Sequence, residues 1–278
     1  MFNLIKNEFI KTFYKKRTYI SFLLITVIMP FIIFAIKNGG SSLELKIYGQ
    51  LQDSFIFFGT LINGYFASYI IIAVLISHMP FLSTIVASEI VSGEYSKGTF
   101  RMYLTRPISR SEVILSKLII VYIYTTLMML FFYLYTVILS IIILGTGDLA
   151  VFHNGLLFLD QSDIIWRFVL AYIISNSIML TITSLCFLFS TISKNSVTPI
   201  ISTISIVFIG TAISFIPIDF FEQVNPYLFT GYIDLFLTAF YDPIPKDKIT
   251  LSILVSITWS VIFVSLSFYF FNKKDILD

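Results

Sequence analysis

Glu89, Glu94 and His78 are the residues of this chain whose types could carry acid–base chemistry, because carboxylates and imidazoles are common proton donors and acceptors in enzymes. Glu89 and Glu94 are five positions apart, so they do not share a helical face well, and His78 precedes Glu89 by eleven positions. The second histidine, His153, is distant in the sequence. We therefore expect neither a catalytic site nor a metal site.

A second pattern, formed by Gly93, Gly98 and Thr99, is similar to the glycine spacing of a phosphate-binding loop. The lysine that follows the second glycine of such a loop is missing here, and no strand-like segment precedes it. The chain is therefore expected to bind no cofactor itself. If ATP is used, its hydrolysis takes place on a separate partner chain.

These residues belong to a polar and basic segment, residues 88–117, that lies between two long uncharged segments. Residues 54–88 and 118–147 contain no Asp, Glu, Lys or Arg, and both segments are long enough to cross a bilayer. The excess of Lys and Arg in 88–117 predicts that it lies on the cytoplasmic side. Ser109 with Glu112 three positions later predicts a capping box, so we expect a helix over 89–104, a break near Pro107 and a new helix after Ser109.

The polar segment resembles the loop between the second and third spans in the permease subunits of ABC transporters of the type-2 export class. The residues that carry the resemblance are Glu89, Gly93-Glu94, Gly98-Thr99, Leu104, Pro107, Ser109-Arg110 and Lys117. The resemblance implies that 89–104 is a coupling helix against a P-loop ATPase subunit, and that a second permease, identical or homologous, completes the transporter. It assigns the ATPase contact to Glu89, Gly93, Glu94, Gly98, Thr99, Arg101, Leu104, Arg106, Pro107, Ser109 and Arg110, with the three arginines as contacts to the ATPase or to phospholipid headgroups.

Composition independently favours a membrane protein. Of the 278 residues, 57% are hydrophobic and 12% are charged, and the mean hydropathy is +0.92. Soluble domains carry about a quarter charged residues. We therefore predict an all-α integral membrane protein with six transmembrane helices in a single domain, and no nucleic-acid partner.

The predicted elements follow the uncharged segments. Residues 2–17 combine phenylalanines on one helical face with lysines on the rest, which predicts a helix in the headgroup plane, the elbow helix of the resembled family. Gly39-Gly40 predicts a break after the first span, and Pro30 a kink within it. The expected spans are 19–36, 57–87, 111–145, 166–193, 196–217 and 249–271, and an aromatic segment, 219–248, is expected to dip into the outer leaflet.

The distribution of basic residues predicts the orientation. With both termini in the cytoplasm, thirteen Lys and Arg residues lie inside and five outside, which favours this orientation over its inverse. We expect a multi-pass protein of a bacterial cytoplasmic membrane that contacts lipid directly.

Several polar residues fall within the predicted spans. They could line a transport pathway, and hydrogen bonds between helices explain them equally well. The candidate pathway residues are Asn63, Tyr69, His78 and Asn176.

The function that these observations favour is the membrane permease of an ATP-driven exporter for a hydrophobic, peptide-like or lipid-like substrate, with efflux of an amphipathic antimicrobial peptide as one example. Three alternatives remain open from the sequence. They are a small-ion exporter such as a sodium exporter, an intramembrane protease or lipid-modifying enzyme, and a membrane anchor or sensor that recruits a cytoplasmic partner.

Overall fold

The protein is a bundle of long helices in the computed structural model, which describes residues 1–48, 62–96, 98, 109–152 and 155–274. Six described helices are long and apolar enough to cross a membrane, which confirms the all-α membrane fold. The elements in chain order are α1 (Phe2–Phe13), η1 (Lys16–Tyr19), α2 (Ile20–Tyr48), α3 (Gly64–Leu75), η2 (Ile76–His78), α4 (Met79–Ser96), α6 (Arg110–Leu144), β1 (Leu149–Phe152), β2 (Leu156–Leu159), α7 (Gln161–Ile192), α8 (Val197–Ser214), α9 (Asp219–Val224), η3 (Asn225–Tyr227), η4 (Phe229–Phe240) and α10 (Lys246–Lys273).

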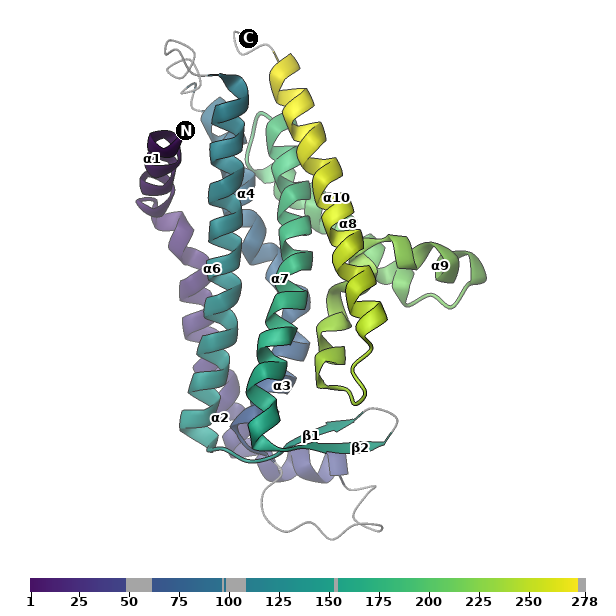
Figure 1. Ribbon diagram of the computed structural model, residues 1–278. Coiled ribbons are helices and arrows are strands. Elements are labelled where there is room, and N and C mark those ends of the chain that lie inside the picture. The colour runs from purple at the N-terminus through teal and green to yellow at the C-terminus, as the bar shows by residue number, and fades with distance from the viewer. Residues whose placement is uncertain (49–61, 97, 99–108, 153–154, 275–278) are drawn as a thin grey trace.

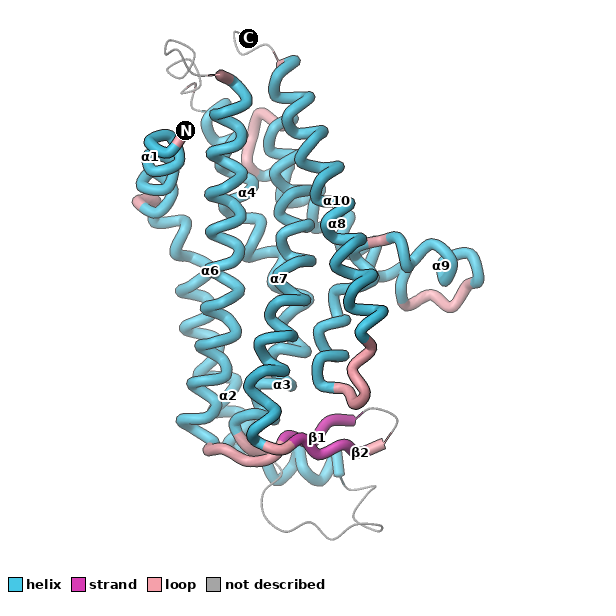
Figure 2. The backbone as a smooth tube through the Cα atoms, viewed as in Figure 1, coloured by secondary structure: helices cyan, strands magenta, loops and turns pink. Residues whose placement is uncertain are grey.

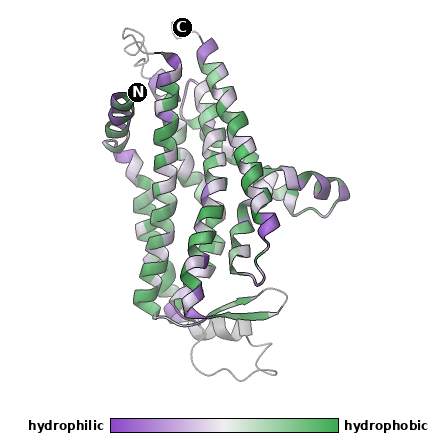
Figure 3. Cartoon of the chain, in the orientation of Figure 1, coloured by the Kyte–Doolittle hydropathy of each residue, from purple (hydrophilic) through white to green (hydrophobic). Residues whose placement is uncertain are grey.

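Both termini lie at one end of the bundle, which we call the terminal end, and the hairpin β1–β2 lies at the opposite end (Figures 1 and 2). Apolar residues cover the helices between these two ends, and polar residues collect near α1, at the helix ends and on α9 (Figure 3). This distribution matches a protein whose middle faces lipid and whose ends face water.

The first span differs from its prediction. The helix α2 passes through Gly39-Gly40 and ends at Tyr48, so the expected break at this glycine pair is wrong. Glycine keeps its backbone N–H and C=O and costs only about 0.5–1 kcal/mol in a helix interior. A helix that is already formed over the apolar residues before it therefore continues, and Pro30 also lies inside α2.

The second span extends further toward the terminal end than predicted. Its described helices begin at Gly64, and the expected start at 57 lies outside the described residues. Because α4 continues to Ser96, the expected boundary between a span ending at 87 and a separate helix starting at Glu89 is wrong. The polar end of α4 remains helical because it packs between other helices: the backbone N–H of Ser92 donates to Ser190 Oγ over 3.0 Å, and Ser190 donates to the carbonyl of Ser88 over 2.6 Å. The remainder of 89–104, from 99 on, lies outside the described residues.

The helix α7 is the centre of the bundle. It packs against α4, α6, α8, α10 and η4, and it is the most buried of the six candidate spans. Its polar residues join its neighbours: Thr181 donates to the carbonyl of Ser256 on α10 over 3.0 Å. The α6 helix, expected over 111–145, runs from Arg110 to Leu144, and α7, α8 and α10 differ from their expected ranges by a few residues at their ends.

The end of the bundle opposite the termini contains regular secondary structure in place of a simple loop. The segment between α6 and α7 forms an antiparallel hairpin with Leu149 opposite Leu159, which the sequence did not predict. Gly64 at the start of α3 lies so close to the end of α6 that an added Cβ would be 2.6 Å from Ile141 Cα. A side chain at this position would therefore separate α3 from α6.

The expected dipping segment, 219–248, consists of α9, η3 and η4. In Figure 1, α9 projects sideways from the bundle and η4 returns along α7. Phe236 and Phe240 of η4 are buried, and Phe240 packs edge-on against Phe168 of α7 with 4.9 Å between ring centroids. The aromatic residues of η4 are therefore part of the core, whereas Phe220 and Tyr227 before it are exposed.

Candidate functional site

The terminal end carries a buried group of two acids and two bases, Glu8, Lys11, Glu94 and Lys117, which we call the ion-pair cluster. Lys117 Nζ of α6 lies 2.8 Å from Glu8 Oε2 of α1 and 2.8 Å from Glu94 Oε1 of α4. Lys11 is ion-paired with Glu94 as well, and lies 3.9 Å from Glu8. The cluster therefore joins three helices that are far apart in the sequence.

Because most of this cluster is buried, each of its charges depends on an opposite charge for stabilisation. Lys117 is 0% exposed, Glu8 is 2% exposed and Glu94 is 4% exposed. Removing one member of a buried ion pair costs about 3–5 kcal/mol, because the remaining charge is left without compensation. The cluster contains two acids and two bases, and the ion pairs between them hold α1, α4 and α6 together at the terminal end.

The orientation of α1 follows from the cluster. Its polar residues Glu8 and Thr12 face the bundle, whereas Phe2, Ile10 and Phe9 are exposed. The predicted apolar face is therefore divided: Leu4, Ile5 and Phe13 pack against the bundle, whereas Phe2 and Phe9 are available to lipid.

Glu89 forms a weaker connection beside the cluster. Its carboxylate oxygens lie 3.5 Å from Lys15 Nζ and 3.6 Å from Arg17 Nη1, and the Arg17 side chain is 71% exposed. Exposed ion pairs of this kind contribute about 0–1 kcal/mol. In this structure Glu89 and Glu94 pair with basic residues of their own chain. Their expected contact with an ATPase stays a prediction.

Gly93 and Gly98 have separate roles at the end of α4. A Cβ on Gly93 would lie 2.7 Å from Glu89 Cγ, so its absence leaves room for the Glu89 side chain one turn earlier in α4. Gly98 has a positive φ of 65°, a conformation that glycine adopts at little cost. The expected site residues Thr99, Arg101, Leu104, Arg106 and Pro107 lie outside the described residues.

Ser109 and Arg110 begin α6 and attach it to α10. Ser109 forms the predicted capping box with Glu112. Arg110 Nη1 donates to the carbonyl oxygens of Asn272 over 3.1 Å and of Lys274 over 3.0 Å. Arg110, expected to contact an ATPase or a headgroup, therefore caps the last carbonyls of α10.

Lys274 continues this connection to α7. Its Nζ donates to the carbonyls of Thr191 and Ile192 over 2.9 and 3.0 Å, and it lies 3.9 Å from the ring centroid of Tyr95. Partial burial, together with the charge of Lys194, lowers the pKa of Lys274 from 10.5 to about 8. Lys274 thus connects the ends of α4, α7 and α10.

The lowered pKa of Lys274 predicts a pH dependence. The folded protein penalises the charged amine, so the penalty is complete below about pH 8 and disappears as the pH rises toward 10.5. We expect stability relative to a Lys274→Met variant to increase over this interval, and acetic anhydride to label Lys274 with a midpoint near pH 8. Mass spectrometry of labelled peptides measures the midpoint, with a short lysine peptide as the control; a midpoint near 10.5 would contradict the prediction.

The four candidate pathway residues lie in different environments. Asn63 caps α3 by accepting from the backbone N–H groups of Tyr65 and Phe66, and its Nδ2 donates to the carbonyl of Asp148 over 2.6 Å. Tyr69 packs edge-on against Phe240 at 5.1 Å. The amide oxygen of Asn176 is buried, with no hydrogen-bond partner among the described residues. The structure does not bring these three residues together.

His78 is exposed near the middle of the second span. It follows Gly64 by fourteen residues and precedes Ser96 by eighteen, and its Nδ1 is 3.2 Å from Ser77 Oγ and 3.3 Å from the carbonyl of Val74. Both contacts are within its own turn, and no hydrogen bond to another helix is seen among the described residues. An ionisable group at this depth is expected to face protein or water instead of lipid.

Sequence reasoning missed Glu8, Lys117 and Arg167 as structural residues. Arg167, expected outside the membrane, is 6% exposed on α7 and donates to the carbonyls of Ala239 and Tyr241 at the end of η4. Signals for all three were present: Glu8 is the one acid in residues 2–17, and the two bases directly precede long apolar segments. Their partners, however, are 72 to 109 positions away.

Comparison with known proteins identifies the family to which this chain belongs. Residues 4–210 match the sequence profile described as "ABC-2 family transporter protein". The chain is also 27% identical over 200 residues to YhcI of Bacillus subtilis (strain 168), an uncharacterized protein, and the matched region covers 69% of this chain and 63% of that relative. The match over most of the chain, with six apolar helices, shows that this protein belongs to the ABC-2 family of membrane transporter components.

Proposed function

We propose that this chain is the permease subunit of an ATP-driven exporter, and that it moves a hydrophobic, peptide-like or lipid-like substrate out of the cytoplasm or the inner leaflet. A separate P-loop ATPase supplies the energy, and a second permease completes the pathway. The terminal end, with both termini, faces the cytoplasm of a bacterial cell.

The observation that supports this proposal is that the helices before and after residues 97–108 are both attached to other helices of the bundle. Before this segment, Glu94 is ion-paired with α1 and α6. After it, Ser109 caps α6 and Arg110 binds the end of α10. A displacement of the segment by a partner would therefore move several helices together, as a rigid-body transition requires.

The position of His78 supports a pathway on the α3–α4 face. His78 is exposed, and Val74 and Phe81 beside it are 59% and 40% exposed. An imidazole at mid-span is stable there if a second permease or a water-filled pathway covers it. Its apolar neighbours suit a hydrophobic or amphipathic substrate.

Co-purification from the native host tests the proposal. We expect the tagged chain, extracted in mild detergent, to bring down a P-loop ATPase and nucleotide hydrolysis. A double variant, Arg101→Glu with Arg106→Glu, is expected to recover about tenfold less ATPase, since interface arginines are frequent energetic anchors. Mass spectrometry and an ATPase assay provide the readout.

The matched control is Lys16→Glu, which reverses an exposed charge on η1 at the same end. It should recover as much ATPase as the unchanged chain. Glu94→Arg is unsuitable because Glu94 is buried and its replacement would unfold the terminal end. Recovery of well-folded chain with no ATPase would refute the exporter and favour an anchor or an enzyme.

A further inference from the structure

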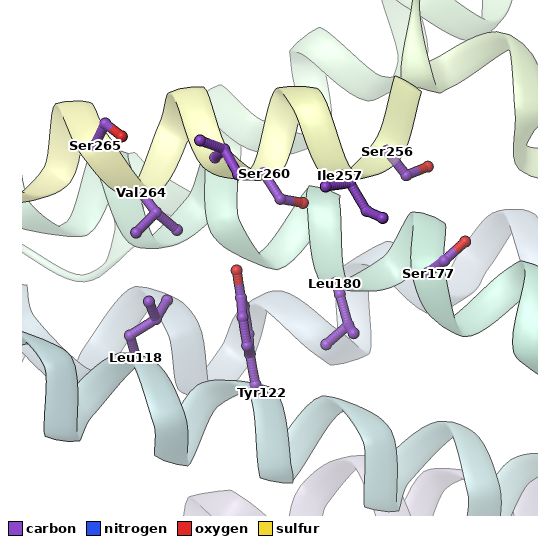
Figure 4. Close-up of a pocket in the computed structure, with 10 residues that line it drawn as sticks. Leu118, Tyr122, Ser177, Leu180, Ser256, Ile257, Ser260, Val264 and Ser265 are labelled. Carbon is purple, nitrogen blue, oxygen red and sulfur yellow. The ribbon is translucent and has the colours of Figure 1, made fainter. Parts of the chain in front are cut away.

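The side of the bundle between α6 and α10 is suited to lipid. A groove there is lined by apolar side chains such as Leu118 and Val264 and by hydroxyl groups, and none of its described lining residues is charged (Figure 4). Lipid chains can cover such a surface without burying a charge. Two other surfaces of the chain, on α9 and around His78, carry ionisable side chains and need a different environment.

The helix α9 is attached to the bundle at the middle of the membrane-spanning helices. Shortly after α9, the carbonyl of Tyr227 accepts a hydrogen bond from Trp259 Nε1 over 2.7 Å. Trp259 follows the first residue of α10 by thirteen positions and precedes its last residue by fourteen. Before α9, a Cβ on Gly210 of α8 would lie 2.3 Å from Thr230 Oγ1, so the end of α8 is about one turn from the same depth. From there α9 projects sideways (Figure 1).

The acidic side chains of α9 are therefore near the middle of the membrane. Asp219 and Glu222 are exposed, and neither forms an ion pair with a described residue. Their spacing places both on one side of α9, together with Gln223. In Figure 3, α9 is a polar element beside apolar helices. A carboxylate at this depth is stable only against protein or water.

His78 is the complementary group at a similar depth. It is exposed near the middle of its span, and no acid among the described residues lies within ion-pair distance of it. Phe81, one turn later, packs against Phe208 of α8 with 5.6 Å between ring centroids, and Phe208 is two residues before Gly210. In addition, η2, which ends at His78, packs against η4. His78 and the attachment of α9 therefore lie at similar depths in the bundle.

We propose that α9 reaches a second copy of this chain, in which Asp219 and Glu222 contact His78 of the other copy. A two-fold axis along the membrane normal keeps every residue at its own depth, so only groups of similar depth can meet across it. The contact forms twice, because each copy offers the same helix and the same imidazole. This inference rests on the second permease of the proposed function and identifies it as an identical chain.

The surface chemistry of α9 favours a protein over lipid or water. Phe215 and Phe220, beside the acids, are 73% and 65% exposed. Lipid would cover these rings but leave the carboxylates unsolvated, and water would do the reverse. The surface around His78 suits both, because an imidazolium can donate to a carboxylate, while the exposed Val74 and Phe81 can pack against the rings.

Cysteine cross-linking between two differently tagged copies tests the contact. Ser77→Cys lies beside His78 and Gln223→Cys lies on the acidic side of α9, so both leave the proposed partners unchanged. Cys186 is buried and is replaced by Ala in every chain. The full-length chains are reconstituted together in liposomes without ATPase or nucleotide. We expect this pair to give about tenfold more cross-linked dimer than Gln223→Cys with Leu127→Cys, an exposed residue at the middle of α6, because a specific contact raises the effective concentration of the two thiols.

A charge exchange tests the chemistry of the contact. His78→Glu in both copies places like charges opposite each other and should lower the cross-linking by about tenfold. Adding Asp219→Lys and Glu222→Lys to the same chains restores opposite charges and should restore the cross-linking. A yield no higher than that of the Leu127→Cys control, or a loss in His78→Glu that the lysines do not reverse, would overturn the contact. The exporter is tested separately, because an ATPase can co-purify with this chain whichever permease accompanies it.

Discussion

Replacing Lys117 with Met is expected to lower the free energy of unfolding by about 3–5 kcal/mol. The change leaves Glu8 and Glu94 buried with Lys11 as the remaining base of the cluster. Thermal unfolding of the purified chain in detergent should show a Tm lower by on the order of 10 °C.

A double variant separates the effect of charge from that of packing. Lys117→Met combined with Glu94→Gln removes one charge of each sign and leaves Glu8 with Lys11. We expect it to recover at least half of the lost Tm. Lys15→Met is the control, since Lys15 pairs with Glu89 near the surface and its loss should cost less than about 1 kcal/mol. Equal losses in the single and double variants would show that the charge balance is unimportant.

Replacing Arg167 with Met should release η4 from α7. The guanidinium donates over 3.2 Å to the carbonyl of Ala239 and over 2.8 Å to that of Tyr241, and these acceptors would lose a charged donor. Hydrogen bonds from charged groups contribute about 1.5–3 kcal/mol each, so we expect a loss of about 2–4 kcal/mol after partial rehydration. Amide hydrogen exchange across Phe229–Phe240 should accelerate by about tenfold or more.

The test depends on where in the chain amide exchange accelerates in Arg167→Met. The terminal end, including α1, should keep its exchange rates in Arg167→Met, because the ion-pair cluster is at the other end of the bundle (Figure 1). Arg17→Met is the control arginine, since its side chain is 71% exposed and touches Glu89 alone among the described acids. Unchanged exchange in η4 would show that aromatic packing against Phe168 suffices to hold it.

The two variants test the contacts that hold the helices together at opposite ends of the bundle. At the terminal end, ion pairs connect α1, α4 and α6, and carbonyl caps connect α6, α7 and α10. At the far end, Arg167 and the edge-on pair of Phe168 and Phe240 connect η4 to α7. The helices between these ends are joined by hydroxyl groups such as that of Thr181, which donates to the carbonyl of Ser256.

The amino-acid sequence by itself determined the class of this protein. Long uncharged segments predicted six helices across a membrane, because the hydrophobicity of a span is a sum over neighbouring residues. The capping box at Ser109 was predictable for the same reason, since both partners lie within one turn. The polar segment 88–117 indicated the transporter family, and the family match confirms it.

The tertiary structure alone decided which polar residues meet. Glu94 pairs with Lys11, 83 positions away, and Lys117 pairs with Glu8, 109 positions away. Arg167 likewise finds its acceptors more than 70 positions later. The sequence alone shows that these residues are charged, and burying a charge in a membrane protein costs free energy. Which partners stabilise them depends on how the helices pack. A charge in an apolar chain therefore predicts that a partner exists, and only the packing of distant helices determines which residue it is.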